Sequence, residues 1–339
     1  MNYVTGTSSA DFLAGILKEM NEIHGLGNAD TILGGEEGDL LTGDAGDDLV
    51  WGQGGDDTID GGQGSDVLFG NTGNDQITGG SEHDYISGGT GDDVIDANAG
   101  DDVVVSNSGN DVIKGGDGYD ILFGTSGNDT LDGGRGDDYL DGGSDDDTLL
   151  ASEGNDTYIG GAGFDTLDMS AMNGFSRIDL STNTAELSHN NQFYSSYMDS
   201  IERVVLGNGG SHVSGSSEDT VFVGGAGNDW IRGKGGADVY TGGEGRDTYQ
   251  FLKKDVTDGA AVDHVTDFQV GDDVLALSDF AKSGQAWQNV LRMAQTDDGV
   301  VVQGKASGLW VDIVVLDGLD LATSGANGSA MSLQDLGLF

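Results

Sequence analysis

Carboxylates at a fixed spacing are the residues of this chain that are best suited to chemistry. Sixteen aspartates follow one another at intervals of nine residues without interruption, and three more return to this spacing later in the chain. The nineteen positions are Asp30, Asp39, Asp48, Asp57, Asp66, Asp75, Asp84, Asp93, Asp102, Asp111, Asp120, Asp129, Asp138, Asp147, Asp156, Asp165, Asp229, Asp238 and Asp247. Carboxylate oxygens are hard ligands, and a flexible oxygen cage suits Ca²⁺ better than zinc or magnesium. We therefore predict that these aspartates contribute to a series of calcium sites.

Glycines surround each aspartate in the pattern Gly-Gly-x-Gly-x-Asp-x-U-x, where U is a large apolar residue, and residues 61–69 are a clean copy. Glycine adopts backbone conformations that other residues avoid, so six residues can form a tight turn. The carbonyl groups of such a turn can point toward one spot, to which the aspartate adds its carboxylate. We expect backbone and side-chain oxygens to share one cage.

The eighth position of every copy is apolar or aromatic, which predicts a short strand after each turn. These residues are Ile32, Leu41, Val50, Ile59, Leu68, Ile77, Ile86, Ile95, Val104, Ile113, Leu122, Leu131, Leu140, Leu149, Tyr158 and Leu167. Two copies make one coil with a strand on each side and the eighth residues inside, so the structural repeat has 18 residues. The predicted fold class is all-β, a parallel β-roll that is a calcium-binding solenoid.

On these residues the chain resembles the RTX (repeat-in-toxin) family of secreted bacterial proteins, whose nonapeptide repeat it shares. The resemblance implies that calcium lies between successive turns on the same edge of a parallel β-roll. Asp30 and Asp48 would then flank one row of ions, and Asp39 and Asp57 would flank the other. Two rows of eight turns leave at most fourteen gaps for ions.

The charge of residues 25–168 supports the same cation. This segment has 34 acidic residues against two basic ones, Lys114 and Arg135. Without cations such a glycine-rich chain should repel itself open, so we expect calcium binding to be coupled to folding. An acidic low-complexity linker is the alternative interpretation, although such linkers lack a strictly apolar eighth position.

Several copies depart from the pattern. Glu37, Glu82 and Asp145 replace the fourth glycine, and the turns that begin at Ala97 and Ser106 lack the leading glycine pair. The sequence leaves the ion sites around these turns open.

The sequence also suggests a division into five parts. These are residues 1–24 (an N-terminal cap with a degenerate turn), 25–168 (the main RTX roll), 169–223 (an irregular β insertion), 224–278 (a second, short RTX block with closing strands) and 279–339 (a C-terminal cap and type I secretion signal). Apolar residues within 12–23 lie near helical spacing, which suggests a short helix in the cap. Thr220 occupies the aspartate position of the turn before Asp229, so calcium binding in the second block should begin after it. The segment that follows Asp247 is similar to the region after the repeats in serralysin-type proteases.

Composition limits the other classes of function. The chain has no cysteine, no proline and a formal net charge of −47. A disulfide scaffold and thiolate metal sites are therefore excluded, and nucleic acid and anionic membranes are poor partners for so acidic a surface. No apolar run reaches transmembrane length, and the first fifteen residues lack the features of a secretory signal peptide. The sequence has no zinc-protease, nucleophile-elbow or phosphate-loop motif, so no catalytic residue and no organic cofactor are predicted.

Together with these observations, the resemblance to secreted RTX proteins implies a calcium-binding protein that is secreted by a type I machine and acts outside the cell, or at the cell surface, as a structural or matrix component without catalysis. One alternative is a polysaccharide-binding module, which a resemblance to the repeat modules of secreted alginate epimerases suggests. An enzyme with an unrecognised site in residues 170–223 or 279–339 is a third class.

The two outer faces of the predicted roll differ. With 18 residues per coil, Leu33, Trp51 and Phe69 fall in successive strands of one sheet, whereas the other sheet carries Asp60 and Asp96 at the same position. Soluble monomers rarely leave a large apolar patch in water. We expect this face to be covered by the chain's own N-terminal segment or by the part after Asp168, by a second copy, or by an external ligand such as a polysaccharide.

Overall fold

The computed structural model spans all 339 residues and describes residues 1–256, 261–277, 279–280, 291–306, 309–324 and 331–337. The chain divides into two compact units. Unit 1 comprises Met1–Leu167 and Tyr194–Ser200, and unit 2 comprises Asp168–Phe193 and Ile201–Phe339.

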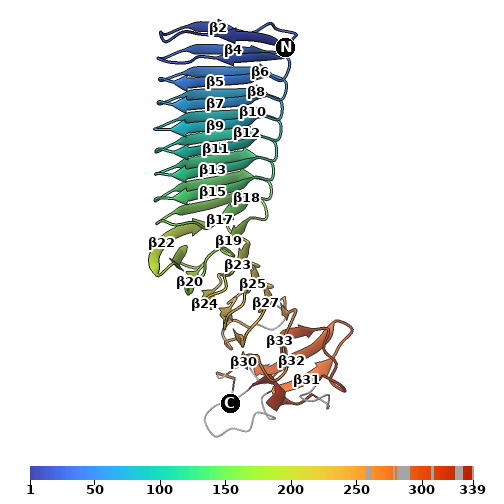
Figure 1. Cartoon of the computed structure of the whole chain (residues 1–339). Helices are drawn as coiled ribbons and strands as arrows, with labels where there is room; N and C mark the ends of the chain where they lie inside the picture. Colours follow the sequence, from blue (N-terminus) through green and yellow to red (C-terminus); the bar gives the residue numbers. More distant parts are fainter. Residues whose placement is uncertain (257–260, 278, 281–290, 307–308, 325–330, 338–339) are drawn as a thin grey trace. The chain divides into compact units, whose positions relative to one another are not determined.

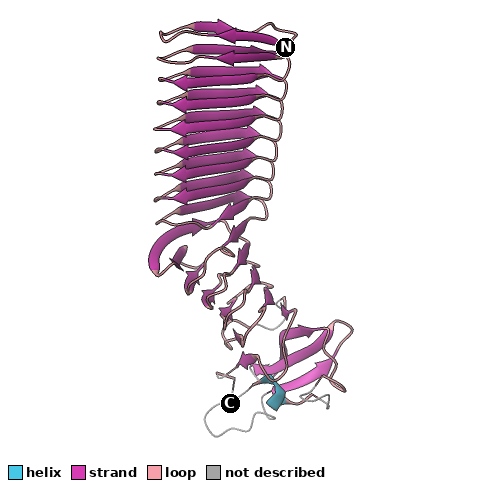
Figure 2. Cartoon of the chain, viewed as in Figure 1, coloured by secondary structure: helices cyan, strands magenta, loops and turns pink. Residues whose placement is uncertain are grey.

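Unit 1 is a stack of parallel strands that run alternately through two sheets (Figures 1 and 2). Sheet A contains β1 (Asn2–Thr5), β3 (Asn21–His24), β5 (Leu40–Ala45), β7 (Thr58–Gln63), β9 (Gln76–Ser81), β11 (Val94–Ala99), β13 (Val112–Asp117), β15 (Thr130–Arg135), β17 (Thr148–Leu150) and β19 (Thr166–Asp168). Sheet B contains β2 (Phe12–Ala14), β4 (Thr31–Gly35), β6 (Leu49–Gly54), β8 (Val67–Thr72), β10 (Tyr85–Thr90), β12 (Val103–Ser108), β14 (Ile121–Ser126), β16 (Tyr139–Ser144), β18 (Thr157–Ala162) and the second part of β22 (Gln192–Asp199).

The register of the strands confirms the 18-residue coil. Val50 in β6 pairs with Leu68 in β8, and Ile59 in β7 pairs with Ile77 in β9. All sixteen eighth-position side chains are at most 2% exposed, so they form one continuous core between the two sheets. Burial of about 25 cal/mol per Å² of apolar surface makes this row the main hydrophobic contribution to the fold.

The N-terminal segment forms strands where the apolar spacing suggested a short helix. β1, β2 and β3 add a first coil to the roll, because β1 pairs in parallel with β3 and β2 pairs in parallel with β4. Leu13 and Ile23 enter the core, while Ile16, Leu17 and Met20 lie exposed in the intervening turn. The helix expectation is wrong because these apolar residues are divided between two strands and a turn.

Unit 2 also has two sheets, with shorter strands. One sheet contains β23 (Arg203–Val205), β25 (Val221–Val223), β27 (Val239–Thr241), β29 (Asp263–Val265), β33 (Leu309–Asp317), β32 (Gly299–Ala306) and β31 (Leu291–Gln295). The other contains β21 (Thr184–His189), β20 (Ser176–Asp179), β24 (Ser211–Ser214), β26 (Trp230–Arg232), β28 (Thr248–Gln250) and β30 (Val274–Ala276).

Pairing in unit 2 is parallel along the coils, and it is antiparallel between β20 and β21 and again near the C-terminal end. β29 pairs in parallel with β33, and β31, β32 and β33 form an antiparallel meander. A short 3₁₀ helix, η3 (Leu333–Leu336), follows, with Leu336 buried. Residues 338–339 of the expected secretion signal lie outside the described residues. In the part of the chain that the structure describes, no helix has the length and apolar character needed to cross a membrane.

Candidate metal centre

The turn aspartates of unit 1 are joined from coil to coil by hydrogen bonds. The backbone N–H of Asp48 donates to Oδ1 of Asp66 at 2.8 Å, and that of Asp57 donates to Oδ1 of Asp75 at 2.8 Å. The same bond recurs between successive members of both rows, from Asp30 to Asp156 in one row and from Asp39 to Asp165 in the other. One carboxylate oxygen of each residue is thereby fixed, and the side chain has a single orientation.

The second carboxylate oxygen is buried in most turns and has no hydrogen-bond partner. These Oδ2 atoms belong to Asp30, Asp39, Asp48, Asp57, Asp66, Asp75, Asp84, Asp93, Asp102, Asp111, Asp120, Asp129, Asp138 and Asp147. A buried charged oxygen without a partner is strongly unfavourable unless a cation or a proton compensates it. The pattern therefore requires a compensating group at each of these turns.

Backbone carbonyls share the space beside the unpartnered oxygens. A Cβ placed on Gly61, the first glycine of its turn, would lie 2.4 Å from Oδ2 of Asp66 and 2.5 Å from the carbonyl oxygen of Gly79 in the next coil. Gly43 and Gly70 have the same surroundings, with Asp48 and Asp75 respectively. Glycine is needed here because a side chain would fill a small cradle lined by oxygen atoms. Oxygen-only donors of this kind fit calcium.

Side-chain carboxylates alone do not complete these cages. Within the described ranges, no three or more histidine, aspartate or glutamate side chains gather where they would hold a metal ion. Carbonyl oxygens of the turns must therefore supply much of the coordination, which agrees with the calcium-type donor set expected from the glycine pattern.

Burial perturbs the acidity of the turn aspartates. Loss of solvent is the main cause that raises the pKa of Asp48 to about 6, that of Asp66 to about 7 and that of Asp57 to about 8. Neighbouring carboxylates raise these pKa values further, while the hydrogen bond from the preceding aspartate lowers them. A cation in the cradle would favour the charged form and reverse the shift.

The second block contains the three expected aspartates and two that the sequence spacing did not reveal. The N–H of Asp238 donates to Oδ1 of Asp263, and the N–H of Asp247 donates to Oδ1 of Asp273. Asp263 and Asp273 thus continue the rows, but they lie 25 and 26 residues further along instead of 18. Both aspartates could have been found from the triplet that each begins, since Asp273-Val274-Leu275 repeats the Asp-x-U part of the pattern.

Thr220 occupies the aspartate position that precedes this block and takes part in the same hydrogen-bonded row. The N–H of Thr220 donates to Oδ1 of Asp238, and Thr220 contributes no carboxylate to its turn. Both carboxylate oxygens of Asp229 are buried without a partner, as is Oδ2 of Asp247.

The outer face of sheet B in unit 1 is almost free of charge. Its seventh and ninth positions from β4 to β16 are Thr31, Leu33, Leu49, Trp51, Val67, Phe69, Tyr85, Ser87, Val103, Val105, Ile121, Phe123, Tyr139 and Asp141. The rings of Trp51 and Phe69 stack with their centroids 5.8 Å apart and an interplanar angle of 9°. The apolar ladder therefore lies on one sheet, as the 18-residue coil predicted.

Residues 1–24 do not cover this face. They form β1, β2 and β3 at the first coil, so the expectation that the N-terminal segment shields the ladder is wrong. Trp51 and Phe69 are half-buried, because side chains of the neighbouring strands flank them within the same sheet. Tyr85 and Ile121 are more exposed.

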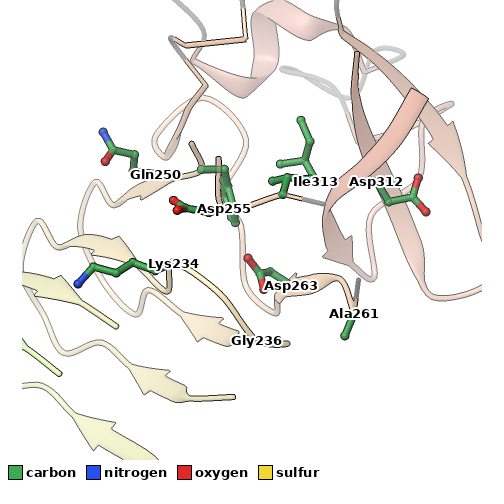
Figure 3. Close-up of a pocket in the computed structure, with 10 residues that line it drawn as sticks. Lys234, Gly236, Gln250, Asp255, Ala261, Asp263, Asp312 and Ile313 are labelled. Atoms are coloured by element: carbon green, nitrogen blue, oxygen red, sulfur yellow. The ribbon is translucent and has the colours of Figure 1, made fainter. Parts of the chain in front are cut away.

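Two hollows among the described residues of unit 2 have linings that bear on substrate binding. The first, lined by Lys234, Asp255, Asp263 and Ile313 among others, has a volume of about 20 Å³ (Figure 3). A single water needs about 10–15 Å³, so this pocket is too small for an organic substrate. The second, of about 480 Å³, opens to solvent and is lined by Asn173, Gly174, Phe175, Ser188, Asn190, Asn191 and Phe193. None of these side chains titrates near neutral pH, so this lining offers no general acid or base.

Comparison with known families agrees with this geometry. A family model of the RTX calcium-binding nonapeptide repeat, which spans four copies, matches residues 24–59, 33–68, 51–86, 69–104, 78–113, 105–140, 132–167 and 214–249. These matches cover more than half of the chain, which therefore belongs to the family of RTX calcium-binding nonapeptide repeat proteins. It is a calcium-binding β-roll protein.

Among solved structures, the crystal structure of the extracellular lipase LipA from Serratia marcescens matches 68% of this chain at 17% identity, with a TM-score of 0.26. This chain covers 45% of that chain, so it spans less than half of the lipase's length. A comparison with curated protein sequences gives no match.

Proposed function

We propose that this chain is an extracellular protein whose roll folds when calcium binds to the turn aspartates, and that it has a structural, surface or matrix role without catalysis. The observation that carries the proposal is the row of buried, unpartnered Oδ2 atoms, which in turns such as those of Asp48, Asp66 and Asp75 lie close to a backbone carbonyl of the next coil. The ligands are Asp30 to Asp147 of the two rows, together with Asp229 and Asp247 in the second block.

Electrostatics explains why folding and binding would be one process. The fold brings aspartates of one row close enough for the N–H of each to reach the carboxylate of the next. Without cations these like charges destabilise the compact state, and their desolvation adds to the cost. Divalent cations between the turns remove both effects, so metal affinity appears as folding free energy.

A calcium titration followed by circular dichroism tests this proposal. The expected result is a largely disordered chain in excess chelator at low salt, and a β-rich spectrum at millimolar calcium. A β-rich spectrum that persists in chelator at low salt would refute the coupling of folding to calcium.

The extracellular assignment and the lack of catalysis need their own tests. RTX repeat proteins are typically secreted, which supports export by a type I machine that reads the C-terminal residues. Removing residues 333–339 should then keep the protein inside a host that carries such a machine, whereas the full chain should reach the medium. Activity screens on polysaccharides and esters with the calcium-loaded protein should give no turnover.

A polysaccharide-binding module is the second candidate, favoured by the nearly uncharged face of sheet B with its Trp51–Phe69 stack. Aromatic rings on a flat sheet can stack on the apolar faces of sugars. Asp141 is the one carboxylate among the seventh and ninth positions of this face from β4 to β16, so acidic polysaccharides are not strongly repelled there. Glycan pull-down in calcium, with the double variant Trp51→Ala and Phe69→Ala, tests this candidate. Val112→Ala on the outer face of sheet A is the matched control.

Binding that the double variant loses and the control retains would support the polysaccharide candidate. No capture, or capture that both variants retain, would reject it. A dimer in the wild type that only the double variant loses would identify self-association through Leu33, Trp51 and Phe69 instead.

A further inference from the structure

One aspartate of the regular series differs from the others in its hydrogen bonds. Oδ2 of Asp156 accepts a hydrogen bond of 2.6 Å from the Tyr158 hydroxyl and one of 3.3 Å from the Ser152 hydroxyl. In fourteen other turns the corresponding oxygen is buried without any partner. The turn of Asp156 therefore provides hydrogen-bond donors for this oxygen from its own side chains, and the other fourteen turns do not.

The sequence of this turn explains the difference. Ala151 and Ser152 occupy the positions of the leading glycine pair, and Tyr158 is the one tyrosine among the sixteen eighth positions of the main roll. The phenol ring is fully buried, so it fills the core space of the usual aliphatic residue. Its oxygen also accepts the N–H of Ser152 at 3.2 Å, which holds the hydroxyl against the carboxylate.

Ala151 also changes the cradle itself. At Gly115, the equivalent residue two coils earlier in the same row, an added Cβ would lie 2.3 Å from Oδ2 of Asp120 and 2.7 Å from the carbonyl of Gly133. Ala151 brings a real methyl group to this position and is buried. The space that glycine leaves open in the Asp120 turn is therefore partly filled at the Asp156 turn.

A similar arrangement occurs at the opposite end of unit 1. Asn21 stands at the aspartate position before Asp39, and its side-chain amide donates to the carbonyl of Glu19 at 2.8 Å and to Oδ1 of Asp39 at 2.9 Å. An N–H group thus faces a turn carbonyl and a carboxylate, the same kinds of oxygen that surround the cradles of the other turns.

Resting on the proposed function, we infer that the turn of residues 151–156 is closed by hydroxyl donors of the chain in place of a calcium ion. A hydroxyl bound to a carboxylate forms a charge-assisted hydrogen bond, which compensates the buried oxygen without any cation. The calcium row that starts at Asp30 then ends at Asp138, one turn before the last aspartate of its register.

The second block uses the same residue type at the same position. The Tyr240 hydroxyl lies 3.3 Å from Oδ2 of Asp238 and 3.2 Å from Oδ2 of Asp263, and accepts the N–H of Gly233. Tyr240 therefore gives Asp238 a hydroxyl partner, as Tyr158 does for Asp156. Tyr249, at the eighth position after Asp247, instead directs its hydroxyl to Oδ1 of Asp267 at 3.4 Å, and Oδ2 of Asp247 has no partner.

The calcium content of two matched variants tests the inference. Asp156→Asn and Asp120→Asn each remove one buried carboxylate of the same row and leave an oxygen for the preceding N–H. Calorimetric titration of the full chain should give the wild-type number of ions for Asp156→Asn and a smaller number for Asp120→Asn. Equal losses in both variants would overturn the inference and leave the proposed function intact, whereas no loss in either would overturn the ligand assignment on which both rest.

A measurement on the wild type covers the case in which a variant fails to fold. Crystals grown in calcium should show anomalous scattering beside Oδ2 of Asp120 and none beside Oδ2 of Asp156. An ion bound to Asp156 would overturn the inference directly.

Discussion

The backbone N–H of Asp48 donates a hydrogen bond of 2.8 Å to Oδ1 of Asp66, the aspartate at the same place in the next coil. This bond leaves Oδ2 of Asp66 turned toward Gly61 and the carbonyl of Gly79. Each aspartate therefore has two separate tasks, because one oxygen ties its coil to the preceding one and the other faces the cradle.

The first prediction separates these buried carboxylates from the general charge of the roll. Asp66→Ala should lower the number of bound calcium ions, and the N–H of Asp48 that it leaves unpartnered should cost about 1–3 kcal/mol of stability. Asp60→Ala removes the same charge from the exposed outer face of β7 and should leave the number of ions unchanged. Calorimetry and thermal unfolding in calcium measure both effects, and equal losses in the two variants would show that the register assignment is wrong.

The second prediction concerns the space beside the first glycine of a turn. Gly61→Ala should weaken calcium binding and cost about 1–3 kcal/mol of stability, because the new methyl group would lie 2.4 Å from Oδ2 of Asp66. Gly27→Ala is the matched control, since the nearest atom to its added Cβ, the carbonyl oxygen of Ala45, would lie 3.8 Å away. Calcium titration and thermal unfolding compare them, and a harmless Gly61→Ala would contradict the cradle.

The third prediction is the pH dependence of the ion-free chain. Burial raises the pKa of Asp57 to about 8 and that of Asp66 to about 7, above the value of about 3.9 in an unfolded chain. At pH values between the unfolded and the folded pKa, the folded state binds more protons than the unfolded state does. The free energy of unfolding of the ion-free roll should therefore be highest in acid and fall as the pH rises through about 6–8.

In chelator, circular dichroism should therefore show more β structure at about pH 5 than at about pH 8.5, while calcium affinity should rise with pH because protons compete for the same oxygens. The opposite trend in chelator would mean that the buried carboxylates are not protonated in the ion-free fold.

The fourth prediction distinguishes a closing aspartate from a ligand in the second block. Asp273 accepts the N–H of Asp247 on Oδ1 at 3.0 Å and the N–H of Gln269 on Oδ2 at 2.7 Å. Asp273→Ala should cost about 1–3 kcal/mol of stability, because both N–H groups lose their acceptor. The calcium number of this variant should equal that of the wild type, and a lower number would make Asp273 a ligand.

Most of unit 1 could be predicted from the sequence because its period is never interrupted. A nine-residue pattern with an apolar eighth position fixes the coil length, the buried residues and the face on which each remaining side chain lies. The hydrogen bond between Asp48 and Asp66 follows from that register, since equivalent residues of neighbouring coils must lie beside one another.

The parts that could not be predicted lie where the period is broken. Asp263 and Asp273 follow loops whose lengths have no repeat, so counting in nines misses them, although their strands return to the same sheets. Ser196 is harder still, because it accepts the N–H of Asp156 from 40 residues away and has no carboxylate to mark it. The hydrogen bond from Tyr158 to Asp156 could not be predicted either. The ring of Tyr158 fits the apolar pattern of the eighth position, and the pattern says nothing about where its hydroxyl lies.

The uniform register of unit 1 bears on how such a protein can change over time. Val67 pairs with Tyr85 and Tyr85 with Val103, so any 18-residue stretch begins and ends at equivalent points of the coil. Duplication or loss of one such stretch in the gene would leave both sheets aligned and every remaining carboxylate opposite a suitable neighbour. Such duplications and deletions would lengthen or shorten the roll by one coil at a time, about 4.8 Å each. The residues at its two ends would not have to change.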